Sequence, residues 1–331
     1  MAKATVEAPS NIAFVKYWGV KDIDQAIPQA PSLSMTLQKC ASRTTVEFAE
    51  GATEADTILK ARPDGTLAPA SPAFADPVRA QLDRIRTWAG HTGTFKVATQ
   101  NSFPAAAGLG SSASGFAALT LATLHALDAN PDGAERSVLA RRSGSGSAAR
   151  SVFGGYVTWP HGDNHAAKQI EPYTHWDLRD VIAVVETTPK NVPSREGHQR
   201  APSSPFYEQR LAHLDDRMKA ARESIAARDF DRLGPIIETE GIELHLITMS
   251  STPPIYYWSP GTIAVLEVVR AMRADGLSAY ATMDAGANVH VICRADDEPQ
   301  IAARLDALDA VHLVIRDGIG PGPTSDVEPL F

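Results

Sequence analysis

The stretch "NSFPAAAGLGSSASGFAAL" at residues 101–119 decides how this chain folds. A run that alternates polar and apolar residues precedes it at 94–100, and an Ala/Leu-rich run follows it at 113–127. This order predicts a strand, a glycine-rich turn and a helix. The first amide groups of a helix have no partner inside the helix, so the turn is suited to an anion such as a phosphate.

Two well-known phosphate loops do not explain this turn. A Walker A loop needs a lysine after its last glycine, and none follows Gly108 or Gly110. "GLGSSA" fits the looser dinucleotide pattern, and Asp128 stands about 20 residues beyond the first glycine. However, 113–127 reads as one helix with no strand before Asp128. Two interpretations remain: a phosphate-binding turn with hydroxyls from Ser111 and Ser112, and an ordinary serine-capped helix.

Composition limits the function classes. The chain has 331 residues, 44% of them apolar and 21% charged, with a formal net charge of −8. It has no block of basic residues and no apolar run of membrane-spanning length, so neither a nucleic-acid nor a membrane partner is expected. We expect a soluble, cytoplasmic protein with one large domain or two ordinary ones. The only cysteines, Cys40 and Cys293, are expected to be buried free thiols.

Strand-like and helical patterns are interspersed along the chain without a strict βαβ rhythm, which predicts an α+β fold. The expected strands cover 43–50, 94–100, 153–159, 180–187, 279–283, 289–293 and 311–315, and the expected helices cover 76–90, 113–127, 205–228 and 259–276. A polar stretch rich in turn formers at 160–179 is expected to be a loop between two lobes.

Six stretches in order resemble the motifs of the mevalonate diphosphate decarboxylases, which are GHMP small-molecule kinases by fold. They are "APSNIAFVKYWGVKD" (8–22), "PSLSMTL" (31–37), "NSFPAAAGLGSSASGFAAL" (101–119), "SGSGSAARSVFGGYVTW" (143–159), "SREGH" (194–198) and "AYATMDAGANVHVI" (279–292). The stretches span nearly the whole chain, and their spacing matches the family. This makes the resemblance far more specific than a single glycine-rich loop.

The resemblance implies a GHMP kinase fold. An N-terminal lobe like ribosomal protein S5 domain 2 would cover 1–178, and a ferredoxin-like C-terminal lobe would cover 179–331. It also implies an enzyme that uses ATP and Mg²⁺ to phosphorylate the tertiary 3-hydroxyl of a 5-phosphorylated mevalonate. Phosphate and CO₂ are then lost together, which leaves an isopentenyl product for isoprenoid biosynthesis. A homodimer is the family's expectation.

The resemblance also assigns roles to single residues. Asp284 would be the general base, Lys16 would keep it ionised, and Arg150 would bind the substrate carboxylate. The ATP phosphates would lie against Gly108, Leu109, Gly110, Ser111, Ser112 and Ala113, and the substrate would contact Asn11, Tyr17, Ser145, Ser147, Arg150 and Arg195. From the residues alone, Asp284 reads as the end of a hairpin and Lys16 as a solvated strand end. The run 143–150 reads as a capped turn before a short helix.

The chain departs from the family pattern where the far phosphate of the substrate is expected. "KYWGK" appears as "KYWGV", with Val20 at the basic position and Lys21 one place late, and the usual Gly-Met is Gly197-His198. Arg195 remains as a cation, which suits one phosphate better than two. We therefore expect mevalonate 5-phosphate to be used at least as well as the 5-diphosphate, which is the family default. The alternatives are a kinase that stops at phosphorylation, such as a mevalonate 3-kinase, and a non-enzymatic nucleotide-binding module.

Overall fold

The computed structural model describes residues 2–104, 110–188 and 190–331. Its larger sheet has the strand order β6-β5-β7-β4-β8-β9, with β1 also paired to β4. The strands are β1 (Ala2–Val15), β4 (Ser32–Glu50), β5 (Thr57–Ala61), β6 (Leu67–Pro69), β7 (Gly93–Asn101), β8 (Tyr156–His161) and β9 (Ala166–Glu171). The long strand β4 pairs with β1, β7 and β8, so it forms the centre of the N-terminal lobe.

Helices cover one face of this sheet. They are α1 (Pro72–Ala89), α2 (Ser111–Ala126), α3 (Gly133–Arg141) and the 3₁₀ turn η1 (Gly146–Ala149). Helix α2 is buried over most of its surface and is rich in alanine, which lets it lie close to β1 and β4. Its N-terminus follows β7 across the glycine-rich stretch, as the sequence predicts.

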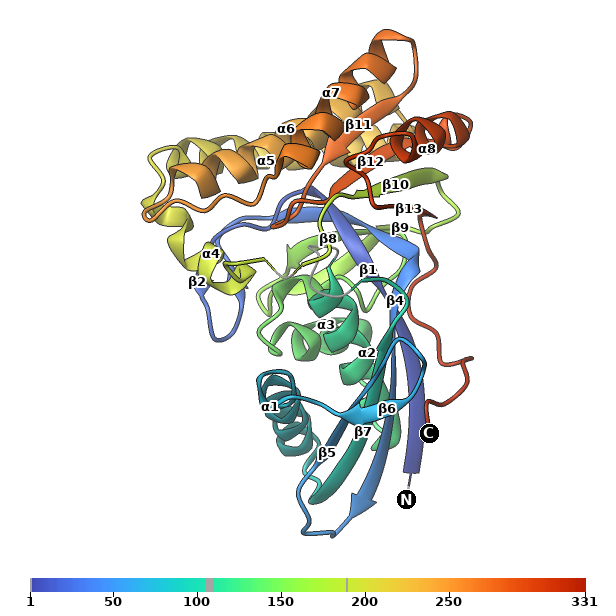
Figure 1. The fold of residues 1–331 in the computed structure, drawn as a ribbon. Coiled ribbons are helices and arrows are strands. Elements are labelled where there is room, and N and C mark those ends of the chain that lie inside the picture. Colours follow the sequence, from blue (N-terminus) through green and yellow to red (C-terminus); the bar gives the residue numbers. More distant parts are fainter. Residues whose placement is uncertain (1, 105–109, 189) are drawn as a thin grey trace.

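The C-terminal lobe has a four-stranded antiparallel sheet in the order β11-β12-β10-β13. The strands are β10 (Leu178–Val184), β11 (Ala279–Thr282), β12 (Val289–Arg294) and β13 (Leu313–Gly318). The helices are α4 (Ser194–Arg200), the 3₁₀ turn η2 (Ala201–Ser203), α5 (Tyr207–Ala227), α6 (Phe230–Ser250), α7 (Pro260–Ala274) and α8 (Glu298–Asp306). Figure 1 shows α5, α6 and α7 above the sheet of the N-terminal lobe.

A shared core joins the lobes. Phe14 and Leu33 from the N-terminal sheet pack in one buried cluster with Ile182 of β10 and with Leu214 and Ile237 of helices α5 and α6. After β13 the chain returns along the N-terminal lobe, where bridges join Leu37 to Ile319 and Glu7 to Thr324. The C-terminus therefore lies near the N-terminus (Figure 1). The lobe boundary at 178/179 stays a prediction.

Two expectations from the sequence are wrong. The stretch 160–179 is not a loop, because it contains β9 and the start of β10. The second error is α6, a 21-residue helix between the two predicted ones. The helical pattern of apolar residues in α6 is interrupted by Gly234, Pro235 and Gly241. A Cβ at Gly234 would lie 2.1 Å from the Tyr280 ring, so this glycine lets α6 press directly onto β11.

The remaining expectations about the elements and the thiols agree with the structure. Each predicted strand and helix overlaps one that is observed, with ends shifted by a few residues or more. Cys40 and Cys293 are buried free thiols. Among the described residues, no helix combines the length and the hydropathy needed to cross a bilayer.

Candidate active site

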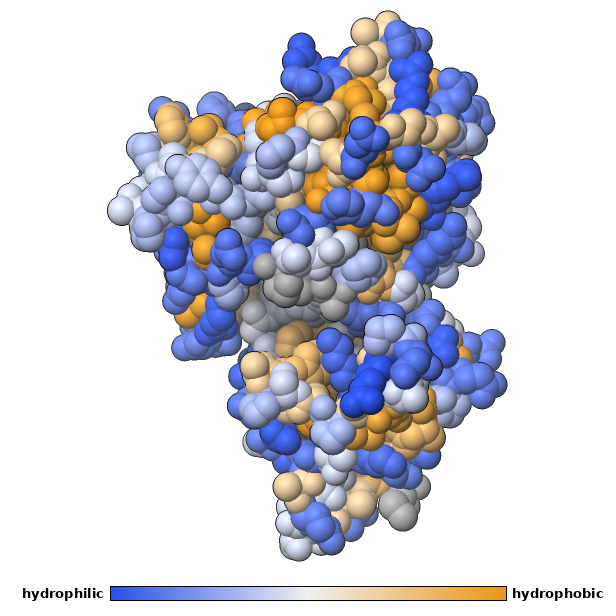
Figure 2. Space-filling model, in the orientation of Figure 1, coloured by the Kyte–Doolittle hydropathy of each residue, from blue (hydrophilic) through white to orange (hydrophobic). Residues whose placement is uncertain are grey.

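A cavity of about 640 Å³ opens where the two lobes meet. Figure 2 shows the hollow between the lobes. Its described lining residues include Tyr17 and Trp18 after β1, Gly110, Ser111 and Ser112 at the start of α2, Ser143, Ser145, Ser147 and Arg150 around η1, Lys190, Ser194, Arg195 and His198 in and before α4, and Asp284 after β11. Five of the six motif stretches thus contribute to one cavity, although they lie far apart in the sequence.

Lys16 and Asp284 form an ion pair at the floor of this cavity. The Lys16 Nζ donates a hydrogen bond to Asp284 Oδ1 at 2.7 Å. The Lys16 side chain is 1% exposed, whereas that of Asp284 is 31% exposed. Asp284 therefore faces the cavity and Lys16 lies behind it. The interpretation of Lys16 as a solvated strand end is wrong, since strand β1 ends inside the lobe interface.

The pair sets the charge states of both groups. Burial opposes ionisation of Asp284, but the charge and hydrogen bond of Lys16, together with the nearby His290 and Arg150, hold the pKa of the carboxyl below its usual value. Burial lowers the pKa of Lys16, and the Asp284 carboxylate opposes this fall. The carboxylate is thus ionised at neutral pH and presents an oxygen to the cavity.

Arg150 is buried, and its partners fix the plane of its guanidinium. Its Nε and Nη2 donate to Asn11 Oδ1 at 3.2 and 3.0 Å, and its Nη1 donates to Ser32 Oγ at 2.7 Å. Burial lowers its pKa to about 10, so it is charged at neutral pH. Of its five N–H donors, one on each terminal nitrogen has no acceptor among the described residues. The guanidinium therefore keeps a donor on each terminal nitrogen that a carboxylate could accept.

Asn11 positions Arg150. Its Nδ2 donates to Ser151 Oγ at 2.8 Å and to the Ser147 carbonyl at 3.2 Å, which turns its Oδ1 towards the guanidinium. Asn11 is buried and is not among the described lining residues of the cavity. Its contacts in this structure therefore support a role in holding Arg150, whereas the predicted direct contact with substrate stays a prediction.

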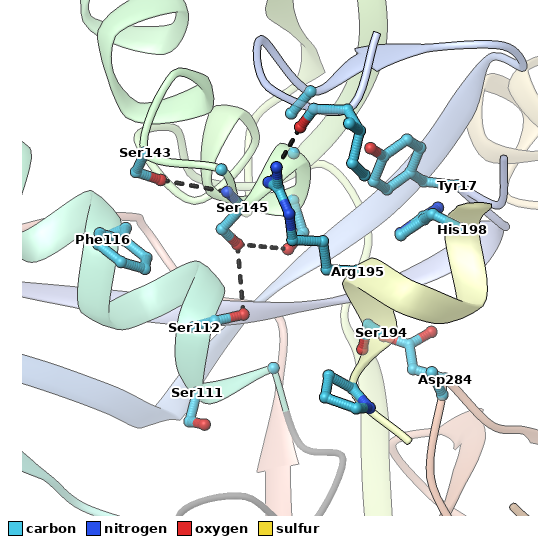
Figure 3. Close-up of a pocket in the computed structure, with 18 of the residues that line it drawn as sticks. Tyr17, Ser111, Ser112, Phe116, Ser143, Ser145, Ser194, Arg195, His198 and Asp284 are labelled. Atoms are coloured by element: carbon cyan, nitrogen blue, oxygen red, sulfur yellow. Dashed lines mark hydrogen bonds between the residues drawn. The ribbon is translucent and has the colours of Figure 1, made fainter. Parts of the chain in front are cut away.

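Serine hydroxyls link the start of α2 to the turn before η1. Ser145 Oγ donates to Ser112 Oγ at 3.2 Å and lies 3.3 Å from Ser147 Oγ. Figure 3 shows Ser111, Ser112 and Ser145 on one side of the cavity and the residues of α4 on the other. The hydroxyls that the resemblance assigns to ATP and those that it assigns to substrate are therefore neighbours.

Gly110 ends the glycine-rich stretch at the N-cap of α2. It has a left-handed conformation, with φ of 71°, and a Cβ there would lie 2.2 Å from Ser10 Oγ. No side chain of the described residues caps this helix, so the amides of its first residues have no side-chain acceptor. These residues are among those that line the cavity. Ala113 is buried, and its N–H donates to the Gly110 carbonyl at 2.9 Å. Gly108 and Leu109 lie outside the described residues.

Aromatic rings form the wall beside Arg150. The ring of His198 lies between Tyr17 and Trp18, with centroids 4.2 and 4.6 Å away, and Tyr17 meets Trp159 edge-on. The Gly19 N–H donates to His198 Nδ1 at 3.1 Å, so Nε2 carries the proton of the neutral ring. Burial lowers the pKa of His198 to about 3, which keeps it neutral. Its imidazole therefore brings no positive charge to the site.

Arg195 is the cation that α4 adds to the cavity lining. Its Nη2 donates to Asp24 Oδ1 at 2.7 Å and its Nη1 donates to the Ile23 carbonyl at 3.0 Å. Val20 and Lys21 lie in β2 (Val20–Asp22), which pairs with β3 (Ile27–Pro28). The pairing is irregular at Lys21, but its side chain is exposed and neither residue is among the described lining residues. Among the described lining residues, α4 thus contributes one arginine, and this arginine is paired with a carboxylate.

No sequence motif indicated Lys190, a lone lysine after β10. Its Nζ donates to Ser194 Oγ at 2.6 Å and to the Ala285 carbonyl at 2.7 Å, beside the Asp284 turn. Burial lowers its pKa to about 8, and the Asp284 carboxylate opposes this fall. Lys190 lines the cavity, so it adds a positive charge that depends on pH near neutrality.

A second, mostly apolar cavity of about 310 Å³ adjoins the first. The two share Pro77 of α1 and Ser111, Ser112 and Phe116 of α2 among their lining residues. Within the described part of the chain, no group of three or more His, Cys, Asp or Glu side chains is placed to hold a metal ion.

Comparisons with known proteins agree with this geometry. Residues 8–170 match the family model of the diphosphomevalonate decarboxylase-like N-terminal domain, and residues 180–314 match that of the mevalonate 5-diphosphate decarboxylase C-terminal domain. A diphosphomevalonate decarboxylase of Candida albicans is 32% identical, with 100% of this chain and 99% of that protein covered. A phosphomevalonate decarboxylase of Haloferax volcanii is 33% identical, with 87% of each covered.

A solved structure of MDDEF, in complex with MVAPP, AMPPCP and magnesium, has the same fold. Its TM-score is 0.88 at 35% identity, and the alignment covers 98% of each chain. The two-lobed GHMP kinase fold expected from the sequence is therefore confirmed. With both lobes matched and the motif residues gathered around one cavity, the chain belongs to the mevalonate diphosphate decarboxylase family.

Proposed function

We propose that this protein catalyses the ATP-dependent decarboxylation of a 5-phosphorylated mevalonate. The observation that carries the proposal is the arrangement of one cavity. An ionised Asp284 faces it, Arg150 is among its lining residues, and the N-terminus of α2 opens onto it. Asp284 would serve the hydroxyl of the mevalonate, Arg150 its carboxylate, and the N-terminus of α2 the phosphates of ATP.

The residues present fit MgATP. The uncapped N-terminus of α2 and the hydroxyls of Ser111 and Ser112 suit the phosphates, and the adjoining apolar cavity suits the adenine. Mg²⁺ is often held by phosphates together with few protein ligands, which agrees with the absence of a three-acid group among the described residues. When bound, Mg²⁺ neutralises charge on the phosphates during transfer.

Asp284 would orient the 3-hydroxyl and take its proton. Its depressed pKa makes it a weak base, but phosphoryl transfer passes through a loose transition state in which positioning matters more than base strength. Lys16 keeps the carboxylate ionised and aimed at the cavity. The bond between the γ-phosphorus and the bridging oxygen of ATP breaks as the 3-oxygen takes the phosphoryl group, ADP leaves, and the hydroxyl proton passes to Asp284. The resulting 3-phosphate is a good leaving group.

Arg150 would hold the substrate carboxylate during the second half of the reaction. As the bond from C3 to the phosphate oxygen breaks, the bond between C1 and C2 also breaks. Its electron pair forms the C2–C3 double bond, and C1 leaves as CO₂. A planar guanidinium fixed by Asn11 and Ser32 keeps the carboxylate in one orientation for this step.

We also propose that the preferred substrate carries a single phosphate. Arg195 is the cation of α4 in the cavity lining, and it is paired with Asp24. Neither Val20 nor the exposed Lys21 is among the described residues of the lining, and His198 is neutral. The Haloferax volcanii relative is a phosphomevalonate decarboxylase, so the family includes this chemistry.

The experiment is to offer mevalonate, its 5-phosphate and its 5-diphosphate with MgATP, and to measure kcat/KM from ADP release. We expect turnover of the 5-phosphate at least as efficient as that of the 5-diphosphate. A preference above about tenfold for the 5-diphosphate, or ~1.4 kcal/mol of discrimination, would restore the family default. No turnover of any of the three would favour a nucleotide-binding module instead.

A homodimer is a further proposal, and it rests on the family resemblance alone. Sedimentation equilibrium of the purified protein tests it. A mass of about 35.4 kDa would indicate a monomer, and twice that mass would indicate the dimer.

A further inference from the structure

The buried ion pair of Glu240 and Arg210 makes hydrogen bonds to the main chain of Lys16. The Lys16 N–H donates to Glu240 Oε2 at 2.9 Å, and the Lys16 carbonyl accepts from Arg210 Nη2 at 3.1 Å. The same Arg210 Nη2 donates to Glu240 Oε2 at 2.6 Å. The side chains of Glu240 and Arg210 are 0% and 2% exposed. Helices α5 and α6 of one lobe therefore hold the end of strand β1 of the other at the residue that pairs with Asp284.

The same helix also holds the main chain of Asp284. His245 lies on α6, five residues after Glu240, and its Nε2 is 3.1 Å from the Asp284 carbonyl oxygen. A carbonyl only accepts, so Nε2 carries the proton and donates. Burial lowers the pKa of His245 to about 3, which keeps the ring neutral. Its buried Nδ1 has no partner among the described residues.

We propose that α6 positions the Lys16–Asp284 pair, with Glu240 and Arg210 fixing Lys16 and His245 fixing Asp284. None of these three side chains is among the described lining residues of the cavity. They act through the main chain of the pair and are positioning residues. The inference rests on the proposed function for its kinetic consequences, but its structural consequences are measurable without substrate.

Glu240 has a second effect on Lys16, because its charge lies in the same buried region. The charged and titratable groups around Lys16 are Asp284, Glu240, Arg210, Arg150, His245 and Asp180. Burial lowers the pKa of Lys16, the carboxylates of Asp284 and Glu240 raise it, and Arg150 lowers it further. Removal of the Glu240 charge therefore lowers the pKa of Lys16, so that neutral lysine appears at lower pH.

The first test is the variant Glu240→Gln in enzyme labelled with ¹³Cε-lysine. The titration of Lys16 is followed by NMR and assigned by its loss in Lys16→Arg. We expect the Lys16 titration to move to lower pH, because the attraction of one nearby carboxylate is lost. The kcat should fall about 10- to 100-fold, since small misplacements of reacting groups are costly, with the KM for ATP within threefold.

The matched control is Glu243→Gln. Glu243 pairs with the same Arg217 that contacts Glu240, but among the described residues it makes no hydrogen bond to the main chain of Lys16. We expect this control to leave both kcat and the Lys16 titration unchanged. An unchanged Lys16 titration together with an unchanged kcat in Glu240→Gln would overturn the proposal. Equal effects from Glu243→Gln would also overturn it, because they would reflect general loss of α5–α6 packing.

The second test removes only the donor to Asp284, and it remains available if Glu240→Gln does not fold. His245→Phe keeps the ring and should lower kcat at least tenfold with the KM for ATP within threefold. His175→Phe is the control. The His175 Nε2 lies 2.9 Å from the Ile225 carbonyl oxygen, and His175 is not among the described lining residues of the cavity. Equal kcat values in the two variants would overturn the role of His245. If the wild type turns over no substrate, the proposed function is wrong. The Lys16 titration would still test whether Glu240 acts on Lys16.

Discussion

The substitution Arg150→Lys keeps the positive charge but removes the planar fork. In the structure, Asn11 and Ser32 use three of the five N–H donors of Arg150, and one donor on each terminal nitrogen is left for a carboxylate. A lysine ammonium in the same place offers one point contact. The loss is therefore about one charge-assisted hydrogen bond, or ~1.5–3 kcal/mol, which corresponds to a fall of about 10- to 150-fold in kcat/KM.

The assay is steady-state kcat/KM for the phosphorylated mevalonate at saturating MgATP, with the melting temperature as a check on folding. Arg86→Lys is the matched control. Arg86 lies on α1, pairs with Asp83 of the same helix and with Asp56 before β5, and is not among the described lining residues. We expect that control to retain wild-type kinetics. A value of kcat/KM for Arg150→Lys within threefold of wild type would remove Arg150 from the carboxylate site.

Three more changes probe other parts of the account. Asp284→Asn, nearly isosteric but unable to take the proton, should lower kcat by about 10²–10⁴-fold while ATP binding persists; retention of more than about a tenth of wild-type kcat would contradict a general base there. The Lys190 ammonium loses its proton as pH rises through its pKa of about 8, so kcat/KM for the phosphorylated mevalonate should fall above that pH. Lys190→Arg should keep the rate level to higher pH, and identical profiles would exclude Lys190 as the titrating group. Gly154→Ala should lower the free energy of unfolding by about 1–3 kcal/mol, because the new Cβ would lie 2.0 Å from the Pro321 carbonyl oxygen of the returning C-terminal segment. Thermal unfolding measures this, and an unchanged melting temperature would show that the segment yields.

Much of the N-terminal lobe was predictable because its signals are local. Alternation along 94–100 and the apolar run at 113–127 predict β7 and α2, and the glycine between them is needed for a left-handed turn. Helix α6 was not predictable in this way. Its glycines match Tyr280 and Thr282 of β11, which lie about forty residues later in the sequence.

The same difference between local signals and long-range contacts applies to the candidate site. The motifs pointed to several residues that line the cavity, such as Tyr17, Ser112 and Asp284, but they gave no sign of Lys190 or of the residues that support the lining. Lys16 reads as a strand end, yet its charge state depends on Glu240 and Asp284, which lie more than 200 residues away in the chain. The pairing of Arg195 with Asp24 likewise follows from the placement of α4 beside β2. Burial and long-range pairing come from the tertiary structure, and a single sequence does not display them.

The most direct measurement is the ratio of CO₂ to ADP formed from mevalonate 5-phosphate and MgATP in one reaction vessel. Substrate labelled with ¹⁴C at the carboxyl carbon lets trapped CO₂ and released ADP be counted together. We expect one CO₂ for each ADP, because Asp284 and Arg150 serve the two halves of one reaction in one cavity. ADP without CO₂ would contradict it and would indicate a kinase that stops at the 3-phosphate.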